Sequence, residues 1–384
     1  MKYLLSNAHI VLDDQTEILQ GSILIEDGMV KKVFSQAESL PEVENIDLDG
    51  KTIYPGFIDL HIHGAMGYDF ITGGKAIEAA SDNLAKDGTT AFLVSLTVLS
   101  PNQTLATLES LQTHQETGAT CLGVHMEGPY LSKEYKALMD ERYLRDPSIE
   151  ETYEMIKASG NMIKTMTIAP ELKGMDAFIP YLVSKQIIPM IGHTAATCQE
   201  ALQGLALGAK GFTHFYNAMS QHTHRNPGCV TAGFLATDNY KEMICDGFHT
   251  DPDVVRMTYK YLGPKQIILI TDAMLGKGLN DGDYVFSGLN CHKEGIHVRV
   301  KETGRIAGSA FGMIDAFRFI KQLVKPTAPE LCALSSGNAA KLIGDNKRGN
   351  LHEGSYADLV IMDKNDQVLA TLNHGEVIYD YRLR

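Results

Sequence analysis

The sequence predicts an α/β fold: a (β/α)8 barrel of the TIM type with a small β-sandwich module built from the two ends of the chain. From about residue 52 onward, short apolar runs alternate with helical stretches, a pattern typical of βα units around a parallel sheet. Eight such runs can be counted, the number that a closed βα barrel needs. The flanking segments show short alternating strand patterns instead. We therefore expect the barrel at 52–344 and the β module at 1–51 together with 345–384.

Capping residues mark the starts of several predicted helices. Ser100 and Asp251 each precede a proline, and Thr197 is followed three residues later by a glutamate, all typical of helix N-termini. The barrel strands are expected at 52–60, 89–96, 120–127, 162–169, 187–192, 210–214, 242–246 and 266–271. The module strands are expected at 3–12, 21–26, 29–34, 354–362 and 376–379, with helices at 310–323 and 328–341.

The composition is that of a globular protein without a nucleic-acid or membrane surface. The 384 residues are 44% hydrophobic and 21% charged, which is ordinary for globular proteins. A net charge of −13 without long Lys/Arg runs argues against nucleic acid or an anionic membrane as partner. The six cysteines lack paired spacing, so we interpret them as reduced thiols. Because neither a signal peptide nor a membrane-spanning run is recognisable, we expect a cytoplasmic location.

Two histidines close the first predicted barrel strand. His61 and His63 are one residue apart, and the period of two in a strand directs both side chains to the same face. Two imidazoles form part of a metal site but do not complete it. In a βα barrel the remaining ligands are expected at the C-terminal ends of other strands.

Four further strand ends carry side chains that suit this expectation. A single histidine at a strand end is more often a hydrogen-bonded structural residue than a ligand, but several at one barrel mouth favour a metal site. Imidazole and carboxylate together suit Zn²⁺ or Fe²⁺. These candidates are Glu127, His193, His214 and Asp272.

Two other residues are weighed as ligands and set aside. His125 lies two residues before Glu127 on the same strand face, and we favour a supporting role for it over direct ligation. Lys164 is a candidate for a carboxylated bridging lysine, but its position early in the strand places it roughly 16 Å below the barrel mouth. Glu127 is the better bridge between two ions.

Several motifs carry a resemblance to a known family. Residues 55–64, PGFIDLHIHG, resemble the entry signature of the amidohydrolase superfamily. The segments HMEGPY at 125–130, GHT at 192–194, HFYNAM at 214–219 and DGFH at 246–249 are similar to the N-acetylglucosamine-6-phosphate deacetylase family. The resemblance extends over essentially the whole chain.

The resemblance implies a role for each matching residue. Glu127, His193 and His214 match the family's primary metal ligands, while His61 and His63 match a second-metal pair, so one or two ions per subunit are expected. Asp272 matches the catalytic acid/base. The positions that match contacts to the sugar phosphate are Asn217, Ala218, Arg225, His249, Ile306, Ala307 and Gly308. The family also implies a homodimer, with a phosphate contact that crosses the interface.

The implied reaction is removal of the acetyl group from N-acetylglucosamine 6-phosphate, giving glucosamine 6-phosphate and acetate in amino-sugar catabolism. A divalent cation activates water and polarises the amide. Asp272 is expected to accept a proton from the attacking water and to pass it to the sugar nitrogen. The planar fork of Arg225 suits a phosphate. His249 is left open between the phosphate and the acetyl oxygen.

One departure from the family pattern keeps alternatives open. Where the family often has a polar substrate contact, this chain has Leu138 and Met139. The rival functions are hydrolysis of a different N-acyl sugar phosphate, hydrolysis of a cyclic amide, and a barrel that has lost catalysis and only binds. The last would be expected to have lost ligands, yet all six candidates are present.

Overall fold

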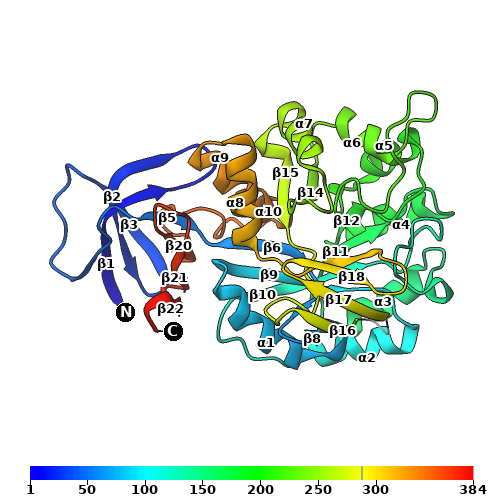
Figure 1. The fold of residues 1–384 in the computed structure, drawn as a ribbon, viewed down its shortest axis with the longest axis horizontal. Helices are drawn as coiled ribbons and strands as arrows, with labels where there is room; N and C mark the ends of the chain where they lie inside the picture. Colours follow the sequence, from blue (N-terminus) through cyan, green and yellow to red (C-terminus); the bar gives the residue numbers. More distant parts are fainter. Residues whose placement is uncertain (287–288, 384) are drawn as a thin grey trace.

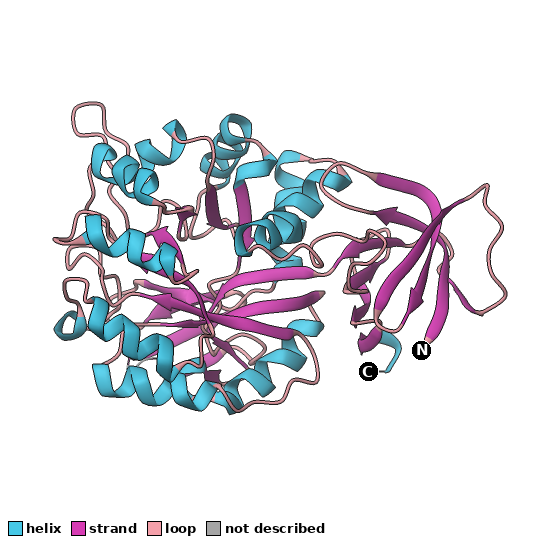
Figure 2. Ribbon diagram, turned by 180° about the vertical axis from the view of Figure 1, so that it is seen from behind, coloured by secondary structure: helices cyan, strands magenta, loops and turns pink. Residues whose placement is uncertain are grey.

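The computed structural model describes residues 1–286 and 289–383. The molecule is elongated, with a small β module that holds both termini at one end and a larger α/β body at the other (Figure 1). The helices of this body surround its strands (Figure 2). No helix within the described residues is long and apolar enough to cross a membrane.

The large body is the predicted parallel barrel. Its sheet has eight strands in the order β15-β14-β13-β12-β11-β10-β9-β6, and a parallel bridge between Ile62 and Ala273 joins the two ends. The fold class predicted from the sequence is therefore confirmed. The strands are β6 (Phe57–Ile62), β9 (Thr89–Leu96), β10 (Thr120–Glu127), β11 (Ile163–Ile168), β12 (Ile188–Ile191), β13 (Gly211–Phe212), β14 (Tyr240–Ile244) and β15 (Ile267–Ile270).

The first predicted strand, 52–60, is two strands in two sheets. β5 (Thr52–Pro55) pairs with strands of the small module, and β6 begins the barrel. The chain passes between the sheets at Gly56, where an added Cβ would lie 2.1 Å from the hydroxyl oxygen of Thr90. Only glycine fits at this close approach. Because the apolar pattern continues on both sides of Gly56, the sequence does not reveal that the chain changes sheet there.

The helices begin where the capping residues predicted. Ser100, Thr197 and Asp251 each accept a hydrogen bond from a backbone N–H of the first helical turn. The C-terminal helices pack against the barrel, and a π-helical turn interrupts the second of them at Ala333–Gly337. The α-helices are α1 (Gly74–Ala85), α2 (Pro101–Leu111), α3 (Ile149–Ala158), α4 (Met175–Ser184), α5 (Cys198–Leu207), α6 (Cys229–Leu235), α7 (Pro252–Leu262), α8 (Met313–Val324), α9 (Ala328–Cys332) and α10 (Asn338–Ile343).

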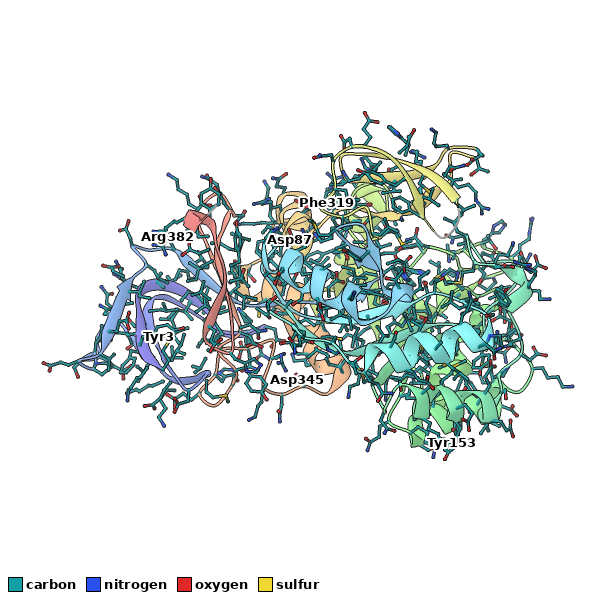
Figure 3. The ribbon with its side chains drawn as sticks, turned by 90° about the horizontal axis from the view of Figure 1, so that it is seen from below. Tyr3, Asp87, Tyr153, Phe319, Asp345 and Arg382 are labelled. Atoms are coloured by element: carbon teal, nitrogen blue, oxygen red, sulfur yellow. The ribbon has the colours of Figure 1, made fainter. Side chains whose placement is uncertain are left out.

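The small module is one eight-stranded sheet to which both ends of the chain contribute. It has its own apolar core, separate from that of the barrel. Tyr3 lies in this module (Figure 3), and its hydroxyl donates to the Gly375 carbonyl oxygen at 2.5 Å, tying the two chain ends together. The strands besides β5 are β1 (Lys2–Val11), β2 (Glu17–Glu26), β3 (Met29–Ser35), β4 (Glu44–Asp47), β20 (Leu359–Met362), β21 (Val368–Asn373) and β22 (Glu376–Asp380).

A four-stranded antiparallel sheet between β15 and α8 was not predicted. One of its faces covers an apolar cluster around Phe286 and Val298, and the other face is exposed, so its residues alternate in the manner of a half-buried sheet. The segment 130–147 packs against this cluster through Leu138. The strands are β16 (Gly282–Phe286), β17 (Leu289–Glu294), β18 (His297–Val300) and β19 (Ile306–Ser309).

Candidate metal centre and active site

The six predicted site residues all lie at the C-terminal ends of barrel strands. Parallel strands bring these ends to one mouth of the barrel. His61 lies in β6 and His63 directly follows that strand, Glu127 is the last residue of β10, and the other three each lie two residues after the end of β12, β13 or β15. They are His61, His63, Glu127, His193, His214 and Asp272.

One group of three ligand atoms centres on Glu127. Its Oε1 lies 3.0 Å from Nε2 of His193 and 3.0 Å from Nε2 of His214. The two histidine nitrogens are 3.1 Å apart. All three side chains are about 95% buried. The arrangement places three potential ligands around one point.

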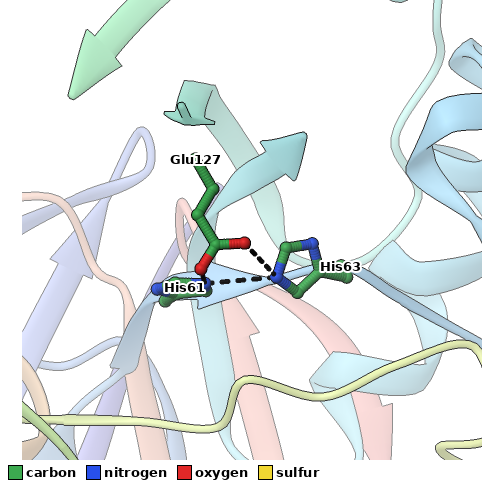
Figure 4. A group of neighbouring side chains, drawn as sticks. All are labelled: His61, His63 and Glu127. Atoms are coloured by element: carbon green, nitrogen blue, oxygen red, sulfur yellow. Dashed lines mark hydrogen bonds and ion pairs between the residues drawn. The ribbon is translucent and has the colours of Figure 1, made fainter. Parts of the chain in front are cut away.

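A second group shares the same carboxylate. Nε2 of His61 and Nε2 of His63 are 3.2 Å apart, and Oε2 of Glu127 is 3.3 Å from Nε2 of His63 (Figure 4). Nε2 of His61 is 3.5 Å from Oε1. Glu127 therefore lies between two histidine pairs and has a carboxylate oxygen close to each of them.

The hydrogen bonds made by the Nδ1 atoms of the first histidine pair determine whether the Nε2 atoms can bind a cation. Nδ1 of His193 donates to the carbonyl oxygen of Tyr135 at 2.8 Å, and Nδ1 of His214 donates to that of Asn217 at 3.2 Å. With the proton on Nδ1, Nε2 of a neutral imidazole carries a lone pair. Two such lone pairs then converge on an oxygen of Glu127, which is also an acceptor. This donor set fits a cation, and the outer bonds are those that orient metal-ligating histidines.

One histidine of the second pair makes a similar hydrogen bond from Nδ1 to a backbone carbonyl oxygen. Nδ1 of His63 donates to the carbonyl oxygen of Ser95 at 3.2 Å. Burial lowers the pKa of His63, but bonds from Asp272 and Glu127 outweigh it and raise the pKa well above its usual value. For His61 burial prevails and the pKa falls well below its usual value. Burial raises the pKa of Glu127, but His61 and the three other histidines outweigh it, so the carboxylate is ionised.

Three of the six site residues have a left-handed backbone conformation. His193, His214 and Asp272 all have positive φ angles, of 46°, 29° and 47°. This left-handed region is unfavourable for residues with a Cβ and is found where surrounding structure enforces it, commonly at functional sites. The sharp turn at each strand end is what directs these side chains into the mouth.

Asp272 lies beside the second histidine pair. Its Oδ1 is 3.3 Å from Nε2 of His63 and 3.6 Å from Nε2 of His61. Its backbone N–H donates to the His61 carbonyl oxygen at 2.8 Å, which fixes its position in the closed barrel. The side chain is 16% exposed, so it can meet both the metal groups and a ligand.

Two buried carboxyl groups below the mouth were missed by sequence reasoning. Oε2 of Glu242 in β14 is 3.5 Å from Nδ1 of His61, and burial raises its pKa to about 8. Asp59 in β6 accepts a 2.5 Å bond from the hydroxyl of Thr271, and burial raises its pKa to about 7. Asp59 could have been identified from the sequence, because it precedes His61 by two residues on the same strand face. Glu242 lies between a lysine and a methionine, and no pattern around it points to a functional role.

The two residues set aside as ligands lie in different places. Both ring nitrogens of His125 are hydrogen-bonded to hydroxyl groups, Nδ1 to Ser95 at 3.1 Å and Nε2 to Thr167 at 2.8 Å. His125 therefore packs beside His61, 4.5 Å between ring centres, without a free nitrogen. Lys164 is exposed near the start of β11, away from the strand ends that carry the ligands.

The loop after β13 contains two of the predicted substrate contacts. Asn217 lies next to His214, since its carbonyl oxygen accepts the bond from the imidazole. The carbonyl oxygen of Ala218 accepts a bond from the N–H of Thr194, 3.1 Å away. This loop is thus linked to the segment that carries His193, and both residues stand at the mouth.

His249 and the segment 306–308 border the same region. Nδ1 of His249 is bonded to Asp246 at 2.7 Å, which leaves Nε2 for a ligand. Ser309, which follows Ile306, Ala307 and Gly308 in β19, donates its N–H to the Asp272 carbonyl oxygen at 3.0 Å. An added Cβ at Gly308 would lie 2.4 Å from Met274, so glycine permits this close approach.

The remaining predicted contacts are less close to the ligands. Arg225 is exposed on the loop between β13 and α6. Leu138 packs against the apolar cluster of the β16–β19 sheet. Met139 packs against Val98 and Leu131 under its own loop. The two apolar side chains hold segment 130–147 in place, and its Tyr135 carbonyl oxygen orients His193.

A closed βα barrel with histidine and carboxylate groups converging at its mouth defines a metal-dependent hydrolase of the barrel type. The Amidohydrolase family model matches residues 52–378. An N-acetylglucosamine-6-phosphate deacetylase of Bacillus subtilis strain 168 is 30% identical over 98% of this chain and 97% of its own length. An N-acetylgalactosamine-6-phosphate deacetylase of Escherichia coli O157:H7 is 30% identical, covering 93% and 94%.

A solved structure shares the whole fold. It is a mutant N-acetyl-D-glucosamine-6-phosphate deacetylase of Mycobacterium smegmatis in complex with N-acetyl-D-glucosamine 6-phosphate, with a TM-score of 0.91, 28% identity, and coverage of 98% of this chain and 99% of that one. The chain belongs to the amidohydrolase family and, within it, to the family of N-acetylglucosamine-6-phosphate deacetylases.

Proposed function

We propose that this protein hydrolyses the acetamide of N-acetylglucosamine 6-phosphate and releases glucosamine 6-phosphate and acetate. The observation that carries the proposal is the convergence of Glu127, His193 and His214 on one point at the barrel mouth. It occurs in a chain related over nearly its full length to enzymes named for this reaction. The geometry of this site is of the kind that the metal-dependent chemistry of the family requires.

The proposed ligands follow from the two groups. Glu127, His193 and His214 would hold one divalent ion, Zn²⁺ or Fe²⁺, and His61, His63 and Glu127 would offer a place for a second. When bound, such an ion supplies the Lewis acidity that makes water a nucleophile near neutral pH and polarises the amide carbonyl. The buried histidines exclude bulk water from this point.

Asp272 is the proposed acid and base. Its carboxylate stands beside both histidine pairs and is partly exposed to the mouth. It accepts a proton from the water that attacks the acetyl carbon, and then gives that proton to the sugar nitrogen as the C–N bond breaks. The bond from its backbone N–H to the His61 carbonyl oxygen anchors the main chain that carries this carboxylate.

The proposed sugar-phosphate contacts surround this point. The free Nε2 of His249 and the fork of Arg225 offer hydrogen bonds to the phosphate, and His249 is also suited to the acetyl oxygen. The other proposed contacts are Asn217, Ala218, Ile306, Ala307, Gly308, Leu138 and Met139.

Two further properties rest on the family resemblance and on the cysteines. All six cysteines are unpaired within the described chain, which fits a reducing compartment and supports a cytoplasmic location. The family resemblance supports a homodimer, in which the exposed Arg225 is available for a contact across the interface. Light scattering of the purified protein measures the assembly directly.

A second candidate substrate is N-acetylgalactosamine 6-phosphate. A relative of equal identity, 30%, carries that substrate in its name, and Leu138 and Met139 depart from the polar pattern expected for the glucosamine enzyme. The two sugars differ at one hydroxyl group, and a site that hydrogen-bonds a hydroxyl discriminates strongly against its absence or misplacement.

The test is an assay of amine and acetate release with a panel of substrates, together with metal analysis of the same sample. The panel contains both N-acetylhexosamine 6-phosphates, free N-acetylglucosamine and a cyclic amide. We expect the highest kcat/KM with N-acetylglucosamine 6-phosphate and at least one bound ion per subunit. Preference for the galactosamine isomer supports the second candidate. Turnover of the cyclic amide alone, or full activity without metal, contradicts the proposal.

A further inference from the structure

A second cluster of metal-ligating side chains lies at the opposite end of β10 from Glu127. His114 and Glu116 belong to the segment that joins α2 to β10 (Figure 1), and Cys121 is the second residue of the strand. One ligand atom from each residue lies within 4.8 Å of the other two. This base of the barrel is far from the chemistry proposed above and has no role in it.

The ring of His114 is oriented as a ligand. Its Nδ1 donates to the carbonyl oxygen of Leu111 at 2.7 Å. A neutral imidazole in this tautomer has its lone pair on Nε2, and Nε2 lies 3.0 Å from Oε1 of Glu116. Two acceptors at this distance need a proton or a cation between them. The arrangement repeats that of His193 and Glu127 at the mouth.

Glu116 and Cys121 are held together by the strand itself. The backbone N–H of Cys121 donates to Oε1 of Glu116 at 2.7 Å. The pairing of β10 with β9 shifts register between Cys121 and Gly123, and Sγ of Cys121 lies 3.6 Å from the Gly123 carbonyl oxygen. Burial and the nearby Glu116 raise the pKa of the thiol to about 12, so Sγ carries a proton until a cation replaces it.

The segment that carries His114 and Glu116 is anchored from the other side. The Thr117 hydroxyl donates to Asp82 of α1 at 2.5 Å, and the Gly118 N–H donates to the Ser81 hydroxyl at 3.0 Å. Asn373 of the small module donates to the Gly118 carbonyl oxygen at 2.9 Å. The ligand positions are therefore set by the fold before any ion binds.

We propose that His114, Glu116 and Cys121 form a second, structural binding site for a thiophilic divalent metal ion such as Zn²⁺. Imidazole, carboxylate and thiolate are all zinc ligands, and three of them leave a fourth position for water. The His114 and Glu116 side chains are 15% and 23% exposed, so that position is open to solvent. Binding transfers the Sγ proton to solvent as the metal–sulfur bond forms, without any redox change.

A bound ion would clamp the α2–β10 connection to the base of the barrel, the end that serves stability rather than chemistry. The inference does not rest on the proposed function, since none of its three residues belongs to the mouth. The protein would then have a catalytic metal site at the mouth and a structural metal site at the base, and only the structural site would have a sulfur ligand.

The test is a titration of the reduced, metal-depleted full-length protein with Co²⁺, followed by absorption in the near ultraviolet. A sulfur-to-cobalt charge-transfer band reports a thiolate ligand and is silent for the His/Glu groups at the mouth. We expect this band in the wild-type protein, saturating with one ion per subunit and abolished by added Zn²⁺. Cys121→Ser should remove the band and one bound ion.

Two further variants keep the result interpretable. His114→Gln leaves the thiol in place and should weaken Co²⁺ binding at this site, with deacetylation unchanged. Cys198→Ser, which removes a partly exposed thiol elsewhere, should leave the band intact. Absence of the band in the wild-type protein, or its persistence in Cys121→Ser, overturns the proposal and leaves His114 and Glu116 as an ion pair.

Discussion

The His193–His214–Glu127 group at the barrel mouth and Lys241 at the base differ in whether their buried polar atoms are satisfied by the protein. At the mouth, Nε2 of His193, Nε2 of His214 and an oxygen of Glu127 meet within 3.1 Å as three acceptors. At the base, the fully buried Lys241 directs its amine to three oxygens, including Gln266 at 2.7 Å. A polar group whose hydrogen bonds are all supplied by its neighbours contributes to the fold alone. Several acceptors that converge without a donor between them indicate a bound ligand.

The largest expected effect comes from breaking the shared carboxylate at the mouth. Glu127→Gln replaces the ionised carboxylate that both proposed ion positions share by a neutral amide, so each position loses a charged ligand. We expect loss of the metal bound at the mouth and a fall in kcat/KM of at least about 10³-fold, the order attributed to a metal's charge stabilisation of several kcal/mol. Metal analysis and the deacetylation assay measure both quantities.

A matched control for this variant is Glu353→Gln, in an exposed turn of the small module. It should retain both metal and activity. Retention of a full metal complement by Glu127→Gln would contradict the assignment of the bridge.

Asp272→Asn should separate chemistry from metal binding at the same mouth. The amide keeps the size of the carboxylate but does not accept and return a proton, so kcat should fall by roughly 10²- to 10⁴-fold. Metal content should stay within error of the wild-type value. Asp238→Asn, at an exposed position before β14, is the control. Loss of metal together with activity would make Asp272 a ligand rather than the acid/base.

Arg225→Ala should change substrate preference with little effect on the chemical step. If the guanidinium binds the phosphate, KM for N-acetylglucosamine 6-phosphate should rise roughly 10- to 100-fold, which corresponds to a charge-assisted bond of about 1.5–3 kcal/mol. Activity on free N-acetylglucosamine, which has no phosphate, should not change. Arg256→Ala, on the exposed face of α7, is the control. An equal loss on both substrates would remove Arg225 from the phosphate site.

The smallest expected effect is a change in stability that depends on Lys241 at the base of the barrel. Burial lowers the pKa of Lys241 from 10.5 to about 7. Between these values the unfolded chain holds a proton that the folded protein lacks, so stability rises with pH through this window. Below about pH 7 both states are protonated and the cost of burying the charge is present in full.

Urea unfolding of the metal-depleted protein at several pH values between 7 and 9 measures this contribution. One proton corresponds to about 1.4 kcal/mol per pH unit in the free energy of unfolding. Lys241→Met should reduce the slope by up to that amount. The exposed Lys185→Met is the control. An unchanged slope in Lys241→Met would show that the amine is charged in the folded protein.

The mouth was more predictable from the sequence than the base. Histidines and carboxylates at the ends of apolar runs are visible because the barrel topology brings all strand ends to one side, as it does for His61 and His193. The site at the base was not visible, since His114 and Cys121 carry no motif and meet only through the α2–β10 connection.

Three further features could not be predicted from the sequence, for physical reasons. The change of sheet at Gly56 is invisible because the apolar pattern continues through it, and only the contact with Thr90 reveals it. The β16–β19 sheet has short strands with an exposed polar face, so its apolar residues are too few to mark it. The protonation of Glu242 depends on burial among side chains of other strands, which no local pattern encodes.

Anomalous scattering at the zinc absorption edge from crystals of the zinc-loaded protein would locate an ion at the barrel mouth. We expect a peak within bonding distance of Glu127 Oε1, His193 Nε2 and His214 Nε2. A zinc-loaded crystal without a peak between these three atoms would contradict this expectation.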